Sequence, residues 1–141
     1  MSLTTDRFFY RVLAESTVHE MTDGRIFNPA RTTIDEEQDR IPYVIITFES
    51  LENQNESKED DMEGPEDRVI IGVLCVAEDR ESLANLTVAV RDAIYGYYQD
   101  LAGESYEDAP QEYQFSAKEV QYDPGKPCCY QQLLYTCETY R

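Results

Sequence analysis

Residues 67–101, DRVIIGVLCVAEDRESLANLTVAVRDAIYGYYQDL, decide the fold, because a strand pattern passes directly into a helix pattern. Residues 67–78 are dominated by β-branched and other apolar residues, which predicts a strand. Alternation places Val69, Ile71, Val73, Cys75 and Ala77 on one face and Ile70, Leu74 and Val76 on the other. Since both faces are apolar, we expect a central strand that is covered on both sides.

Residues 78–101 are predicted to form a long helix that packs on this strand. Asp79 is a suitable N-cap, and Glu81 lies where the helix dipole favours a negative charge. Apolar residues recur at helical spacing, at Leu83, Leu86, Val90, Ile94, Tyr97 and Leu101. One continuous apolar stripe of this length indicates a helix that covers a sheet.

A second strand is predicted before it, at residues 42–50, with Val44, Ile46 and Phe48 on one face. Between the two strands lies ESLENQNESKEDDMEGPEDR, residues 49–68, which is strongly acidic. We interpret the pair as a hairpin whose tip is an acidic, flexible loop at about 51–67.

The remaining sequence adds elements on either side. Residues 4 to about 20 read as a first helix, followed by a turn at 23–25 and a short extended piece. Residues 113–122 and 129–140 read as a hairpin around Pro124 and Gly125, with a positive φ expected at the glycine. The predicted fold is α+β, a single domain of residues 1–141. It has a mainly antiparallel sheet of about four strands packed on one long helix plus an N-terminal helix, in the order α-β-β-α-β-β.

Charge restricts the partners. The formal net charge is −17 and the pI is near 4.2, which opposes binding to nucleic acid or to anionic membranes. The acidic surface is either simply solvated, or suited to a basic partner, or repulsive to nearby DNA. The sequence shows no signal peptide and no apolar run of roughly 20 residues, so we expect a soluble, non-secreted protein with reduced thiols.

The sequence fits known patterns of metal and catalytic sites poorly. If Gly64 occupied the sixth position of a calcium loop, the twelfth, which requires a bidentate Glu, would be Ile70. Glu56 and Lys58 have the Glu-x-Lys spacing of metal-dependent nucleases, but they lie in a polar loop of an acidic chain. The single His19 is expected at a helix end, and the four cysteines match no zinc pattern. We therefore expect no catalytic residues, no metal, no cofactor and no enzymatic activity.

Tyrosines are concentrated in the C-terminal part of the chain and suit protein contacts, because the ring is apolar and the hydroxyl polar. The candidate interaction surface combines acidic and tyrosine side chains: Glu59, Asp60, Asp61, Glu63, Glu66, Asp67, Tyr95 and Tyr98.

The order of segments resembles a known family. The segments follow in this order: GRIFNPA, IPYVIITFES, a long excursion, RVIIGVLCVA running into EDRESLANLTVAVRDAI, and a final hairpin. This order resembles the tail-completion (tail terminator, head–tail joining) proteins of long-tailed bacteriophages and prophages. The resemblance implies an assembly protein without an active site. It would form rings, often hexamers, that contact tail-tube or connector proteins, as a virion component or in the host cytoplasm.

Two other functions remain open at this point. An acidic binding or inhibitory protein of the DNA-mimic type would use carboxylates spaced like phosphates. The third is a metal-dependent nuclease that uses Glu56 and Lys58.

Overall fold

The computed structural model describes residues 4–29, 40–53, 65–99, 110 and 112–140. Within them the elements follow in the order α1 (Thr5–Ala14), α2 (Thr17–Met21), β1 (Ile26–Phe27), β2 (Tyr43–Asn53), β3 (Pro65–Ala77), α3 (Arg80–Gln99), β4 (Glu112–Ala117), β5 (Gln121–Asp123) and β6 (Cys128–Tyr140). The predicted order α-β-β-α-β-β is confirmed for the long elements, and α2, β1 and β5 are additional short ones.

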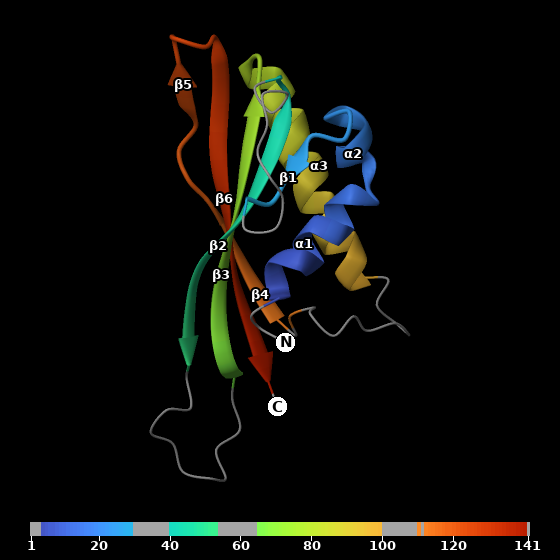
Figure 1. Ribbon diagram of the computed structural model, residues 1–141, viewed down its shortest axis with the longest axis vertical. Coiled ribbons are helices and arrows are strands. Elements are labelled where there is room, and N and C mark those ends of the chain that lie inside the picture. Colours follow the sequence, from blue (N-terminus) through green and yellow to red (C-terminus); the bar gives the residue numbers. More distant parts are fainter. Residues whose placement is uncertain (1–3, 30–39, 54–64, 100–109, 111, 141) are drawn as a thin grey trace.

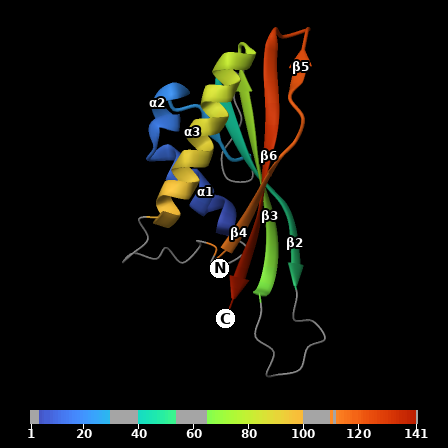
Figure 2. The same ribbon diagram turned by 180° about the vertical axis from the view of Figure 1, so that it is seen from behind.

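The strands form one 6-stranded sheet in the order β1-β2-β3-β6-β4, with β5 also paired to β6. β1 runs parallel to β2, and every other pair is antiparallel. Figures 1 and 2 show α1, α2 and α3 together on one face of the sheet. The α+β class and the mainly antiparallel sheet are therefore confirmed.

The core lies between this face of the sheet and the helices. β3 is central, between β2 and β6, as its sequence predicted. Its predicted inner residues are all fully buried: Val69, Ile71, Val73, Cys75 and Ala77. The stripe of α3 lies against them through Leu83, Leu86, Val90 and Ile94. Burying each large apolar side chain contributes about 1.5–3 kcal/mol, so this contact provides much of the driving force for folding.

The start of α3 confirms the predicted cap. The Ser82 backbone N–H donates to the Asp79 carboxylate at 2.7 Å, and this bond holds the pKa of Asp79 below its usual value.

The single helix predicted at 4–20 is instead two helices. Ser16 has an extended backbone, and its hydroxyl accepts from the Val18 N–H at 3.1 Å and donates to the Leu13 carbonyl at 2.8 Å. One serine thus ends α1 and caps α2, because a serine side chain competes well for backbone groups. α2 ends with a left-handed pair, Asp23 and Gly24, as the predicted turn requires.

Several strand limits differ from the sequence-based ones. β2 continues to Asn53 and β3 begins at Pro65, so both strands extend into the segment expected as a loop; residues 54–64 lie outside the described residues. The strand expected at 113–122 is divided into β4 and β5, which pair with different parts of β6.

The positive φ expected at Gly125 is wrong. Positive φ values occur at Asp23 and Gly24 among the described residues. The Gly125 N–H instead donates to the Asp123 carboxylate at 2.9 Å, so an aspartate side chain closes this turn.

The expectation that β3 is covered on both faces is met only in part. On the face opposite the helices Val76 is buried, whereas the side chains of Ile70 and Leu74 stay half-buried. A Cβ on Gly72 would lie 2.7 Å from the Thr47 hydroxyl and 2.8 Å from the Gln132 amide nitrogen. Polar side chains therefore lie across this face of β3 in place of a helix layer.

One buried polar pair joins the N-terminal helix to the segment after β1. The Asn28 amide donates to the Asp6 carboxylate at 2.9 Å, and both residues are buried. Because a buried polar group without a partner costs about 1–3 kcal/mol, this bond helps to hold α1 against β1.

Candidate protein-interaction site

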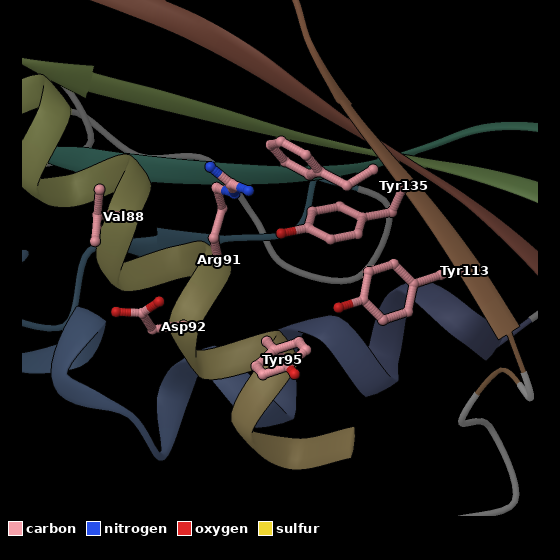
Figure 3. Close-up of a pocket in the computed structure, with 7 residues that line it drawn as sticks. Val88, Arg91, Asp92, Tyr95, Tyr113 and Tyr135 are labelled. Carbon is pink, nitrogen blue, oxygen red and sulfur yellow. The ribbon is translucent and has the colours of Figure 1, made fainter. Parts of the chain in front are cut away.

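A pocket of about 320 Å³ lies between α3 and the strands β4 and β6 (Figure 3). Side chains from these three elements surround it: Val88, Arg91, Asp92, Tyr95, Tyr113, Phe115 and Tyr135. Aromatic residues and arginine are the types enriched at the centres of protein interfaces. The composition therefore indicates a binding site for protein groups.

The outer rim of the pocket is an apolar part of α3. Val88 is 53% exposed and Tyr95 59% exposed. They are seven residues apart, so they lie on the same side of the helix. Both side chains therefore offer exposed apolar surface beside the pocket.

The floor of the pocket is Tyr135 on β6. Its ring contacts the Phe9 ring at 5.0 Å between centroids, Tyr113 at 5.4 Å and Phe115 at 5.3 Å. The residue is only 1% exposed, and its hydroxyl has no hydrogen-bond partner in the described part of the chain. The ring is thus part of the core, while the hydroxyl is a buried donor without an acceptor.

Strand register brings these aromatic residues together. β4 pairs with β6 so that Phe115 lies opposite Tyr135 and Tyr113 opposite Cys137. Side chains directly opposite in an antiparallel pair share a face, so both β4 rings lie on the helix side with Tyr135.

Arg91 provides the positive charge of the site. Its guanidinium carbon lies 4.4 Å from the centroid of the Phe115 ring, a cation–π contact that fixes the side chain beside the pocket. Figure 3 shows the guanidinium and the Tyr135 hydroxyl directed toward the same space, and Asp92 also lines the pocket. A cation and a hydroxyl donor together form a site for a hydrogen-bond acceptor, above all an anionic one.

Burial raises the pKa of both Tyr135 and Tyr113, and the nearby Arg91 charge offsets this only in part. Both hydroxyls therefore stay protonated at neutral pH and remain donors.

The residues proposed from sequence fall in different places. Tyr95 lines the pocket, and Asp67 is half-buried in β3. Glu66 belongs to β3 and Tyr98 to α3. The acidic residues of the hairpin tip lie outside the described residues: Glu59, Asp60, Asp61 and Glu63. The candidate surface as a whole stays a prediction.

Sequence reasoning did not single out Arg91, Phe115 or Tyr135 as site residues. Two signals were present: Arg91 is the only basic residue of α3 after Arg80, and Tyr135 belongs to the C-terminal tyrosine set. The register of β4 against β6 was needed to join them.

The possible metal ligands and the cysteines form no metal-binding or reactive site within the described residues. Within the described residues no cluster of three or more His, Cys, Asp or Glu side chains could hold a metal ion, and Glu56 and Lys58 lie outside them. All four cysteines are free and buried, and burial raises the pKa of Cys75 and of Cys137 to about 12. These two thiols are therefore unreactive core residues. Among the described residues, no helix has the length and apolar character to cross a membrane.

Comparison with known proteins gives a match in fold. No protein-family model matches the chain, and no curated protein sequence matches it. Solved structures do match. In one of them, the virion of a native gene transfer agent particle, a chain superposes with a TM-score of 0.61 at 12% sequence identity. The match covers 94% of this chain and 92% of that one. At this identity the likeness shows a shared fold over nearly the whole length of both chains.

Proposed function

We propose that this chain is a structural virion protein, a single-domain subunit of the tail-completion or head–tail joining type. It assembles by protein–protein contacts into a ring, with six copies as the number that the family resemblance implies. The observation that carries this proposal is the fold shared over 94% of the chain with a chain of a gene transfer agent virion. The order of the sequence segments and the shared fold both support a virion protein.

The pocket beside α3 supports the proposal. Its lining is mainly aromatic, with one arginine and one aspartate, and an exposed valine and tyrosine border it. Aromatic residues and arginine are the types enriched at the centres of protein interfaces, so this lining supports contact with another protein chain.

Net charge fits a ring around DNA. At −17 per chain, a ring would carry a large negative charge. A negative wall repels the phosphates of DNA that passes through a channel and keeps the DNA from adhering. In this proposal some of the acidic residues between Asp35 and Asp67 face the channel or a basic partner protein.

The direct test is the mass and shape of the purified chain. Native mass spectrometry and negative-stain electron microscopy are expected to show a closed ring, formed by the chain alone or after mixing with a phage tail-tube protein. A chain that stays monomeric at all concentrations, with and without that tube protein, contradicts the proposal.

The high negative charge also favours one competing function, a DNA mimic. A mimic would displace duplex DNA from a DNA-binding protein in a competition assay, whereas a virion subunit would not. Displacement by the monomeric chain would replace the assembly proposal with the mimic.

A further inference from the structure

Tyr135 presents a group that the chain itself does not use. Its hydroxyl is buried, has no hydrogen-bond partner in the described part of the chain, and is directed into the pocket (Figure 3). Native proteins rarely leave a buried donor unpaired, and each such group calls for a specific explanation. A phenylalanine would supply the same ring contacts without that cost, so the hydroxyl points to an acceptor from outside the chain.

Arg91 presents a second unused donor at the same place. Arg25 lies 3.8 Å from the Asp23 carboxylate, and Arg68 lies 3.3 Å from that of Glu138. Arg91, by contrast, contacts the Phe115 ring and has no carboxylate partner among the described residues. Its guanidinium is held in place by stacking, and its N–H groups remain available.

We propose that this pocket binds a carboxylate side chain from a second copy of the chain, with the Tyr135 hydroxyl and the Arg91 guanidinium as the donors. An arginine and a hydroxyl converging on one space are suited to a carboxylate, which accepts several charge-assisted hydrogen bonds. This inference rests on the proposed ring and names the contact that closes it.

The charge of the chain supports a second copy as the occupant. The chain has 29 acidic residues against 12 basic ones, so neighbouring copies repel each other overall. Association of such chains requires local contacts that place a cation of one copy against an anion of the next. A second copy offers many carboxylates, and Arg91 is a cation already held beside a pocket.

The pocket also resembles the centre of a protein interface, because exposed apolar side chains border its polar groups. Val88 and Tyr95 border it with exposed apolar surface, which excludes water once a partner packs there. A carboxylate bound inside that border would lose its water, and its bonds to the two donors would be stronger as a result.

The test is the dissociation constant for self-association, measured by analytical ultracentrifugation on the full chain. Tyr135→Phe removes only the hydroxyl and is expected to weaken association about tenfold. Arg91→Gln is expected to weaken it about tenfold or more. Arg80→Gln is the matched control: it makes the same charge change on the same helix, in the first turn of α3, and is expected to change association less than about threefold.

Asp92→Asn tests whether the ligand of the pocket is negatively or positively charged. Asp92 lines the same pocket, so removing its charge should favour an incoming carboxylate and strengthen association by about twofold. Weaker association after this change would mean that the pocket receives a cation, and would overturn the proposal.

Urea unfolding in dilute solution separates binding from folding. Tyr135→Phe is expected to leave the subunit as stable as the wild type, because the hydroxyl has no partner within the described chain. If wild type and Tyr135→Phe form equally stable rings, the pocket contact is overturned while the ring stands. If the wild type never associates, either alone or with a tail-tube protein, ring and contact both fail.

Discussion

Two buried polar sites of this chain satisfy their groups in different ways. At the N-terminal helix, the Asp6 carboxylate and the Asn28 amide are buried together and hydrogen-bonded at 2.9 Å. At the floor of the pocket, the Tyr135 hydroxyl is equally buried and has no partner in the described chain. The first site serves the fold, because both buried groups are hydrogen-bonded within the chain.

The fold alone does not explain the unpaired hydroxyl of Tyr135 at the second site. Tyr135 contributes its ring to the core and its hydroxyl to a pocket that also contains Arg91. One side chain thus belongs to two functions, stability through the ring and recognition through the hydroxyl. Substitutions at these two sites show which groups stabilise the fold, because only those groups lower the free energy of unfolding when they are removed.

The largest effect is expected from Tyr135→Ala. It removes a ring that contacts Phe9, Tyr113 and Phe115, and should lower the free energy of unfolding by about 3–5 kcal/mol. Urea titration followed by circular dichroism measures the change. A loss below about 1 kcal/mol would show that the ring is not part of the core.

The next effect is expected from Asn28→Ala. It removes the donor to the buried Asp6 carboxylate and should cost about 1–3 kcal/mol. Asn85→Ala, at an exposed position of α3, is the control and should cost nothing, since alanine favours helix. Equal effects of both changes would contradict a structural role for the buried pair.

A smaller effect is expected from Gly72→Ala, on the sheet face away from the helices. The added methyl group would meet the Thr47 hydroxyl and the Gln132 amide, so these side chains must move, at a cost of about 1 kcal/mol. The double variant Gly72→Ala with Gln132→Ala should regain part of that stability. If Gly72→Ala alone is neutral, the polar groups on this face adapt freely.

The smallest effect on stability is expected from Tyr135→Phe. Because it removes a buried donor that has no partner in the described chain, the free energy of unfolding should stay within about 0.5 kcal/mol or rise. A loss above about 1 kcal/mol would mean that the hydroxyl is bonded in the isolated subunit, and the contrast with Asp6 would disappear.

Much of the fold could be predicted from local sequence. The alternation in β3 and the stripe of α3 place the core correctly, because both elements have strong periodic patterns. Asp79 was recognisable as a cap for the same reason: its contact with Ser82 is only three residues away. The division of the first helix was missed, since Ser16 is as acceptable on a helix face as in a cap until its backbone is known.

The site was less predictable. Tyr95 could be proposed as a contact residue from its place in a tyrosine-rich region. The pocket, however, depends on β4 pairing with β6 and on α3 lying across them, which brings Arg91 to Phe115 from a distant part of the sequence. Local patterns contain no information on that register. An unpaired hydroxyl, likewise, is a property of the packed structure.

The most direct test of the central claim is a cryo-electron microscopy structure of the assembled chain at a resolution that shows side chains. We predict a ring in which a carboxylate of the neighbouring copy lies about 2.5–3.0 Å from the Tyr135 hydroxyl and also contacts the Arg91 guanidinium. A ring in which this pocket faces solvent and holds only water would contradict the claim.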